Sequence, residues 1–223
     1  DRITPAKRVA MALSELILTR YPKDTLDILV FGNDAKPISI KELPYLKVGP
    51  YHTNTVAGLQ LAMDMLSKKK NNNKQILMIT DGKPSCLKMP DGSYYKNSAG
   101  LDQKIVKKCY TMAKQARKLK IPITTFMIAR DSYLQHFIRE FTKANNGKAF
   151  YTGLDNLGEM IFEDYETNKK RKIYMKKPTI STLEELKKSG YKSESIKDEL
   201  KRNLTQLLKA VSYTHLRAHE TMA

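Results

Sequence analysis

The segment KQILMITDGKPS, residues 74–85, constrains the fold of this chain more than any other stretch. Residues 76–80 are a run of apolar and β-branched side chains between a polar Asn/Lys cluster and a Gly/Pro turn. Such a run is typical of a strand buried on both faces, in a sheet covered by helices on both sides. Ligands of these sheets bind at the carboxyl ends of the strands, where Asp81 stands. In isolation, however, an Asp-Gly pair is more often a turn than a site.

Helical and strand patterns alternate along residues 1–166 and predict an α/β fold, a three-layer, doubly wound and mostly parallel sheet. Helices are expected near residues 1–21, 55–66, 102–120, 132–145 and 157–166, and strands near 26–31, 37–40, 76–80, 121–129 and 148–151. Residues 84–101 are expected to form a long loop beside Asp81. Lys83, Ser85 and Tyr94 would then border a binding surface for a partner.

A second polar loop, GPYHTNT at residues 49–55, precedes a helical pattern in which Leu59, Met63 and Leu66 share a face. Together the two loops resemble the von Willebrand factor A (vWA) domain and its metal-ion-dependent adhesion site. The family pattern is D-x-S-x-S after the first strand, a Thr in a T-x-T loop and an Asp in a T-D-G loop. Thr53 and Asp81 match the metal-binding Thr and Asp, whereas D-x-S-x-S occurs nowhere in the chain. Thr55 is expected to cap the helix.

The resemblance implies that residues 1–166 are a vWA domain truncated at its amino end and lacking its first, central strand. Loss of that strand would expose apolar surface on both neighbouring strands and remove several metal ligands. The cofactor implied is Mg²⁺ or Mn²⁺, held weakly or not at all by the truncated chain. Hydroxyl and carboxylate oxygens are the ligands that such hard cations prefer.

The function implied is metal-bridged protein binding without catalysis, in which the metal accepts an Asp or Glu carboxylate of a client protein. The resemblance is to the bacterial, magnesium-chelatase/MoxR-associated (CoxE-like) type, whose partners are AAA+ ATPases. The implied protein is therefore an adaptor that presents a client to such an ATPase for remodelling or for metal or cofactor insertion.

The last quarter of the chain differs in character. Residues 167–177 form a basic linker. Residues 178–210 are predicted to be helical, and residues 176–209 resemble the amino-terminal leader of a magnesium-chelatase-like AAA+ ATPase; an ordinary amphipathic tail is the alternative. Residues 211–221 resemble translated sequencing-adapter read-through, as in a metagenomic fragment, so residues 211–223 are expected to be a non-native, disordered tail.

Two other functions remain open from the residues alone. The net charge of +17 invites a nucleic-acid-binding interpretation, but nearly half of the excess lies beyond residue 166 and the remainder is spread along helix faces. A Mg²⁺-dependent phosphohydrolase would need a nucleophilic Asp with a second carboxylate after a strand, and only Asn33-Asp34 occupies such a position. Two cysteines form no disulfide framework, and no apolar run is long enough to span a bilayer, so a cytoplasmic location is expected.

Overall fold

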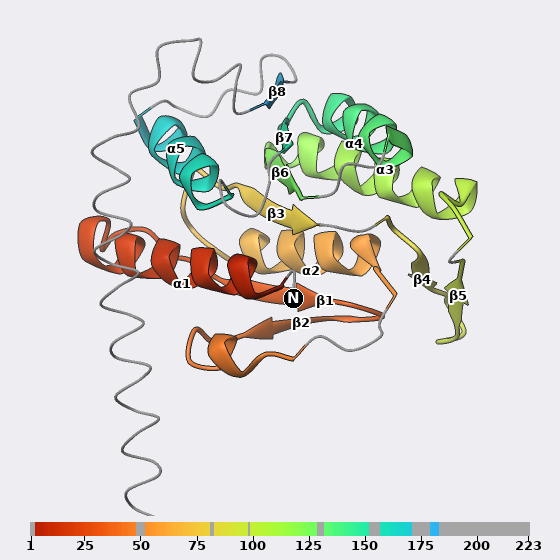
Figure 1. Cartoon of the computed structure of the whole chain (residues 1–223), viewed down its shortest axis with the longest axis horizontal. Helices are drawn as coiled ribbons and strands as arrows, with labels where there is room; N and C mark the ends of the chain where they lie inside the picture. The colour runs from red at the N-terminus through yellow and green to blue at the C-terminus, as the bar shows by residue number, and fades with distance from the viewer. Residues whose placement is uncertain are drawn as a thin grey trace, which may run out of the picture.

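The computed structural model describes residues 3–47, 52–80, 83–97, 99–128, 132–151, 157–170 and 179–182. The helices are α1 (Ile3–Arg20), α2 (Thr55–Ser67), α3 (Gln103–Lys118), α4 (Ser132–Asn145) and α5 (Leu157–Lys170), with a short 3₁₀ turn, η1, at Leu43–Tyr45. The strands are β1 (Ile28–Phe31), β2 (Ala35–Ile38), β3 (Ile76–Thr80), β4 (Cys86–Lys88), β5 (Tyr94–Lys96), β6 (Ile123–Met127), β7 (Lys148–Tyr151) and β8 (Thr179–Thr182). Figure 1 shows the arrangement.

Four parallel strands form the main sheet, in the order β3-β6-β7-β8. The register pairs Ile76 with Ile123 and Thr80 with Met127. Strands β1 and β2 make a separate antiparallel hairpin. The α/β class and the mostly parallel, doubly wound sheet predicted from the sequence are confirmed.

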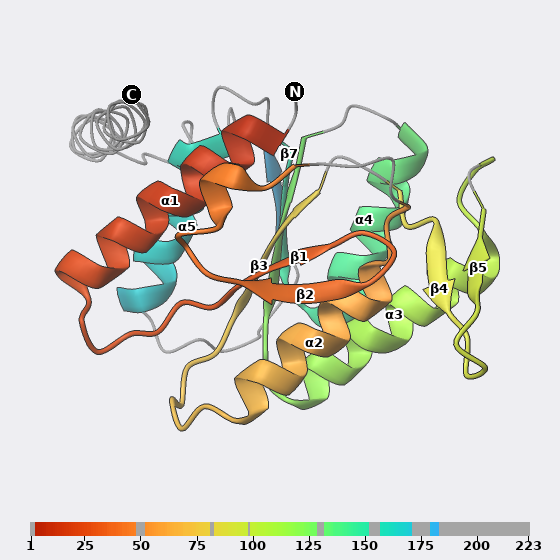
Figure 2. The same ribbon diagram turned by 90° about the horizontal axis from the view of Figure 1, so that it is seen from below.

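Helices cover both faces of the sheet, and Figure 2 views the sheet nearly edge-on between them. Helices α1 and α5 pack on one face in a cluster with Phe126 and Phe150. Helices α2, α3 and α4 pack on the other face, in a cluster that includes Met78 and Ile123. All five residues of β6 are buried, because β6 has a strand on each side and helices on both faces. The Cys109 side chain is buried in the second cluster, as predicted.

Strand β3 departs from the expectation of burial on both faces, because Met78 is its only buried residue and the other four are half-buried. All four residues of β1 are half-buried as well. The physical reason is that β1 and β3 do not pair with each other. Within the described residues each of these strands has one hydrogen-bonded neighbour, β2 for β1 and β6 for β3.

The long loop predicted for residues 84–101 is instead largely a β-hairpin, formed by β4 and β5. A turn at residues 89–92 closes it: the Gly92 N–H donates to the Met89 carbonyl at 2.9 Å, and Gly92 has a φ of 84°. Glycine suits that turn because it adopts positive φ without strain. The hairpin projects from one end of the molecule (Figure 1).

The segment predicted to be helical from residue 178 begins with a strand. Residues 179–182, Thr-Ile-Ser-Thr, form β8 and pair in parallel with β7. β-Branched side chains favour strand over helix, which accounts for the difference. The rest of the predicted helical leader, the basic linker beyond residue 170 and the tail at 211–223 lie outside the described residues. In the part of the chain that is described, no helix is both long and apolar enough to cross a membrane.

Candidate functional site at the carboxyl edge

The carboxyl ends of β1 and β3 meet at the loop that carries Thr53. On the β1 side, the Asn54 N–H donates to the Gly32 carbonyl at 2.7 Å. On the β3 side, the segment after the strand returns to the same loop at Ser85. The loop predicted from the sequence therefore lies where a doubly wound sheet binds ligands.

Thr53 and Ser85 are joined by two hydrogen bonds. The Thr53 N–H donates to the Ser85 hydroxyl oxygen at 3.1 Å, and the Ser85 N–H donates to the Thr53 carbonyl at 3.0 Å. Ser85 is buried, with 7% of its surface exposed, and its carbonyl accepts the Asn97 N–H at 2.9 Å. The sequence suggested that Ser85 borders an exposed partner surface. In the structure Ser85 is buried and positions the Thr53 backbone.

Asn54, and not Thr55, caps helix α2. The Asn54 side-chain oxygen accepts the Ala57 N–H at 3.0 Å, and its amide nitrogen donates to the Asn33 carbonyl at 2.8 Å. Asn54 is 1% exposed, so both bonds are sheltered from water. Asn is a preferred N-cap residue, and Thr55 is already the first residue of the helix.

Asn33, which the sequence offered only with Asp34 as a phosphohydrolase candidate, has a structural role at this edge. Its side-chain oxygen accepts the His52 N–H at 3.1 Å, so Asn33 anchors the start of the loop as well as its cap. The only sequence signal is its place directly after β1 in Gly-Asn-Asp, which is also typical of a turn.

The Thr53 hydroxyl has no hydrogen-bond partner among the described residues, although its backbone is held on both sides. Thr53 is half-buried. A neutral hydroxyl oxygen can serve as a ligand of a hard cation. Within the described ranges, however, no three His, Cys, Asp or Glu side chains gather into a possible metal site. Thr53 could therefore supply one ligand to a metal ion, but the described residues do not supply a complete metal site. Its predicted companion Asp81 lies outside the described residues.

Tyr94 lies on the hairpin and bonds to the loop after β1. Its hydroxyl donates to Asp34, whose carboxylate also pairs with Lys88 at 3.4 Å. The Tyr94 hydrogen bond, and then that of Lys88, lower the pKa of Asp34 below its ordinary value. These contacts connect the hairpin to the loop after β1. Asp34, the carboxylate that the phosphohydrolase hypothesis placed at a strand end, therefore already bonds to two side chains of the hairpin. Lys83 is half-buried and takes no part in these contacts.

The sequence was compared with models of known protein families. The model of the family described as "Rv0959-like protein, vWA domain" matches residues 1–166. The chain belongs to the Rv0959-like vWA family. Domains of the vWA kind commonly mediate protein–protein interactions.

Relatives of this vWA domain occur among curated proteins. The uncharacterised protein Rv0959 of Mycobacterium tuberculosis and the uncharacterised protein Mb0984 of Mycobacterium bovis are each 31% identical to it over 171 residues. The alignment covers 74% of this chain and 25% of each relative, so the chain spans about a quarter of their length. The solved SpRpn10 VWA domain aligns with a TM-score of 0.47 at 17% identity, over 69% of this chain and 79% of that one.

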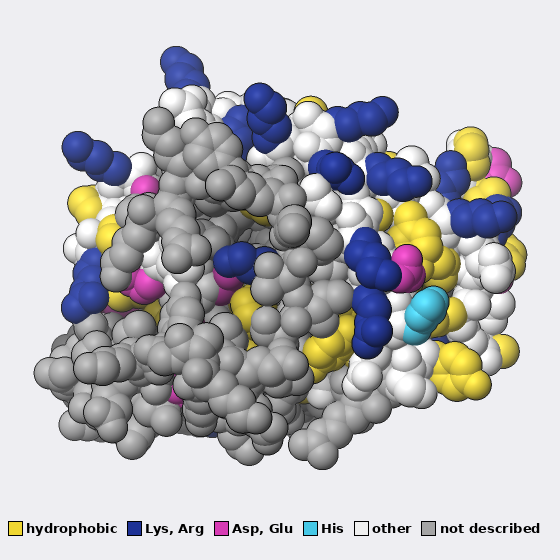
Figure 3. All heavy atoms as spheres, turned by 90° about the horizontal axis from the view of Figure 1, so that it is seen from above, with side chains coloured by type: hydrophobic (Ala, Val, Ile, Leu, Met, Phe, Trp, Pro, Cys, Tyr) yellow, Lys and Arg dark blue, Asp and Glu magenta, His cyan; other side chains and the backbone are white. Residues whose placement is uncertain are grey.

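Helix α3 of the vWA domain carries a strongly basic outer face. The helix contains no acidic residue, and six of its exposed side chains are basic: Lys104, Lys107, Lys108, Lys114, Arg117 and Lys118. Figure 3 shows Lys and Arg side chains spread over the side of the molecule that includes α3 and α4. The charge follows a helix surface and is separate from the hydrogen-bonded cluster around Thr53.

Proposed function

We propose that this vWA domain is a metal-ion-dependent protein-binding adaptor and not an enzyme. The observation that carries the proposal is the state of Thr53. Its backbone is fixed from two directions by Ser85, while the hydroxyl of this half-buried residue has no partner among the described residues. A hydroxyl whose backbone is held in place and whose oxygen has no protein partner is available to an external ligand.

The ligand we propose is Mg²⁺ or Mn²⁺, bound by the Thr53 hydroxyl and the Asp81 carboxylate. Both are hard oxygen donors, which small divalent cations prefer, and such cations keep open or water-filled positions. The bound cation would supply a position for an Asp or Glu carboxylate of a protein that the domain binds, including the ATPase proposed as its partner. Two protein ligands hold a cation weakly, so affinity in this chain is expected to be low.

The partner we propose is a MoxR or magnesium-chelatase-type AAA+ ATPase in the cytoplasm. Support comes from the resemblance of residues 176–209 to the leader of such an ATPase. The hydrogen-bonded edge that holds Thr53 supports a binding role for this end of the sheet.

The test is binding of the purified chain to a purified MoxR-type ATPase, measured by biolayer interferometry in Mg²⁺ and again in EDTA. The expected result is binding that EDTA abolishes and that Thr53→Val weakens at least tenfold. Thr111→Val is the matched control, because the Thr111 hydroxyl is exposed on α3 and bonds only to the Lys107 carbonyl in its own helix. Binding that is equal in Mg²⁺ and EDTA, or equally affected by both variants, contradicts the metal site.

A further inference from the structure

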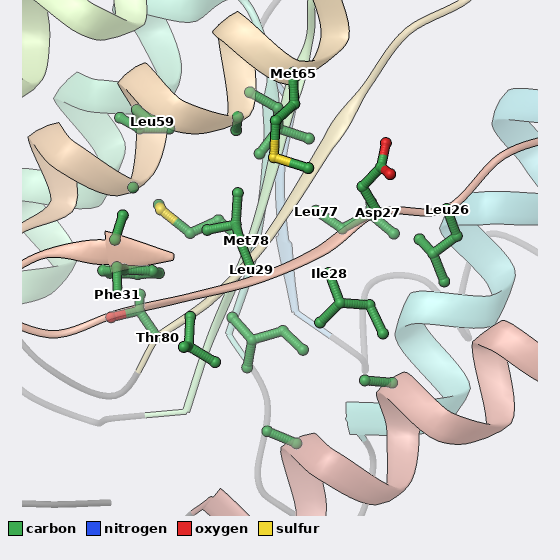
Figure 4. Close-up of a pocket in the computed structure, with 18 of the residues that line it drawn as sticks. Leu26, Asp27, Ile28, Leu29, Phe31, Leu59, Met65, Leu77, Met78 and Thr80 are labelled. Atoms are coloured by element: carbon green, nitrogen blue, oxygen red, sulfur yellow. The ribbon is translucent and has the colours of Figure 1, made fainter. Parts of the chain in front are cut away.

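The hairpin of β4 and β5 has an open strand edge at the surface. Strand β4 lies against α2, and β5 lies on its outer side in both ribbon views (Figure 1 and Figure 2). Within the described residues, β5 pairs with β4 alone. The unpaired edges of β1 and β3 have different surroundings, because they line an apolar cavity of 1290 Å³ whose walls include Leu29 and Met78 (Figure 4). The edge of β5 faces outward, and Lys96 on it is exposed.

The register of the hairpin determines which backbone groups point away from it. The Met89 N–H donates to the Ser93 carbonyl at 2.8 Å, next to the turn. Bonded and non-bonded pairs alternate along an antiparallel ladder, so Tyr94 and Lys96 both belong to non-bonded pairs. Their N–H and C=O groups therefore point away from β4. In the described part of the chain these groups bond to no residue beyond the hairpin.

The side chains along this edge are basic and aromatic. Lys88 stands opposite Tyr94 and shares the outward face of the hairpin with Lys96. The two ammonium groups lie 5.7 and 5.8 Å from the centroid of the Tyr94 ring. On the inward face Tyr95 packs against the core, with the Lys104 ammonium 4.5 Å from the centroid of its ring. Cations at such distances are attracted to the face of an aromatic ring, which keeps them close to the edge.

The carboxylates near this edge are already engaged. Asp34 bonds to two side chains of the hairpin, and Asp91 bonds to its neighbour Ser93 within the turn. Asp102 accepts bonds from two side chains and caps α3. Lys96 and Lys104, in contrast, have no carboxylate within 4 Å among the described residues. The basic outer face of α3 continues from Lys104, so the charge favours an acidic partner.

The open edge and the charge together select the class of partner. A second copy of the hairpin would bring like charges together, and lysine on an edge strand generally prevents such self-pairing. A nucleic acid would meet the lysines but has no peptide backbone to pair with the edge. An extended acidic peptide uses both features, because its backbone bonds to the open strand and its carboxylates pair with the lysines across the strands.

We propose that β5 docks an extended acidic segment of a partner protein, which adds to the hairpin as a third, antiparallel strand. Acidic side chains of the segment stand opposite Tyr94 and Lys96, and apolar side chains stand beside Tyr95. In this register the backbone groups of the acidic residues form the new hydrogen bonds, because directly opposite residues bond to each other. The docking uses no metal and goes beyond the adaptor site proposed at Thr53.

The test is binding of the peptide Thr-Glu-Val-Glu-Val-Glu-Thr to the isotopically labelled full chain in EDTA. NMR follows the shifts and the hydrogen exchange of the Tyr94 and Lys96 amides, which should both become protected. N-methyl groups on the Glu nitrogens should weaken binding about tenfold, because they remove the donors that face β5. N-methyl groups on the Val nitrogens point away from β5 and should change the affinity by less than about twofold.

A pair of variants of the chain tests the charge. Lys96→Glu should weaken binding of the unmodified peptide about fivefold or more, because it reverses a cross-strand pair. Lys114→Glu makes the same charge change about three turns along α3 and should weaken binding by less than about twofold. If Lys96→Glu shifts the Tyr95 amide in the free protein, Lys96→Gln replaces it, with a smaller loss expected.

Binding that survives methylation of the Glu nitrogens overturns the proposal, because the peptide then does not extend the sheet. Equal losses in the two lysine variants also overturn it, since they show a general attraction of acidic chains to a basic protein. Absence of binding, or binding in Mg²⁺ alone, contradicts it as well. Protection of the same amides by single-stranded DNA, or by rising protein concentration without peptide, assigns the edge to a nucleic acid or to a second copy and contradicts the acidic peptide.

Discussion

Thr53 and Ser85 bond to each other in both directions: the Thr53 N–H donates to the Ser85 hydroxyl oxygen at 3.1 Å, and the Ser85 N–H donates to the Thr53 carbonyl at 3.0 Å. Residues 32 positions apart in the sequence are thereby fixed at the carboxyl edge, where the segments after β1 and β3 converge. Only one of the two bonds uses the Ser85 side chain, so substitution of Ser85 by alanine can remove that bond and leave the backbone bond in place.

Ser85→Ala removes the acceptor of the Thr53 N–H in a buried position. We expect a loss of about 1–3 kcal/mol in the free energy of unfolding, because an unsatisfied buried donor keeps its desolvation penalty. Urea denaturation measures it. The control is Ser67→Ala, whose exposed hydroxyl bonds to Asp64 on the helix surface and whose loss should change stability by less than about 0.5 kcal/mol. Equal effects of the two variants would show that Ser85 does not hold the loop.

Lys148→Met should destabilise the domain much more than Lys143→Met. Lys148 pairs at 2.5 Å with Asp164, whose side chain is 0% exposed and also accepts the Thr124 hydroxyl at 3.0 Å. Loss of the lysine removes the Lys148 ammonium from a buried carboxylate, which we expect to cost about 3 kcal/mol or more. The Lys143–Glu140 pair is exposed on α4, so its loss should cost less than about 1 kcal/mol. Thermal and urea unfolding of both variants decide; similar losses would contradict the importance of the buried pair.

Asp102 should make the domain sensitive to acid. Hydrogen bonds from Asn97, then from Tyr95, lower the pKa of Asp102 from 3.8 to about 2. Because the folded-state pKa is the lower one, this stabilisation is present above about pH 4 and is lost as the pH falls towards 2. Asp102→Asn keeps a good helix cap and removes the titration. The melting temperature of the wild type should therefore fall more steeply than that of the variant between pH 4 and pH 2, and parallel curves would refute this assignment.

Gly147→Ala should be strongly destabilising. A Cβ at Gly147 would lie 2.1 Å from the Ile123 carbonyl oxygen, a backbone atom that cannot move without shifting β6. We expect a loss of about 3 kcal/mol, at the upper end for overpacking. Gly100→Ala is the control, because a Cβ there meets nothing within 4 Å. Circular dichroism melts compare them, and a Gly147→Ala protein as stable as Gly100→Ala would contradict the close approach.

The sequence predicts the parts of this fold that depend on local patterns. The run at 76–80 is β3 with unchanged bounds, and the stripe of Leu134, Phe137, Ile138 and Phe141 is the buried face of α4. These features can be read locally because an unbroken apolar run predicts a buried strand, and apolar side chains at helical spacing predict one buried face of a helix. The hairpin of β4 and β5 was missed although Pro90-Asp91-Gly92 is a turn signal, because three-residue strands show too little alternation.

The candidate site was predictable only in part. Thr53 was identified by its resemblance to a family motif, and the structure puts it at the expected edge. The roles of Asn33, Asn54 and Ser85 depend on bonds between segments that are distant in sequence, which no local pattern encodes. The Tyr94–Asp34 contact joins residues 60 positions apart and was unforeseen for the same reason.

The most direct test of the central claim is Mn²⁺ titration of the isotopically labelled chain, followed by NMR line broadening. A paramagnetic ion bound at Thr53 broadens the amide signals of Thr53 and Ser85 first, even when binding is weak. We predict that this selective broadening is reversed by excess Mg²⁺ and is absent in both Thr53→Val and Asp81→Asn. Thr53 and Ser85 signals that stay sharp while other carboxylate-bearing surfaces broaden, or unchanged broadening in Thr53→Val, would contradict a metal site at this edge of the sheet.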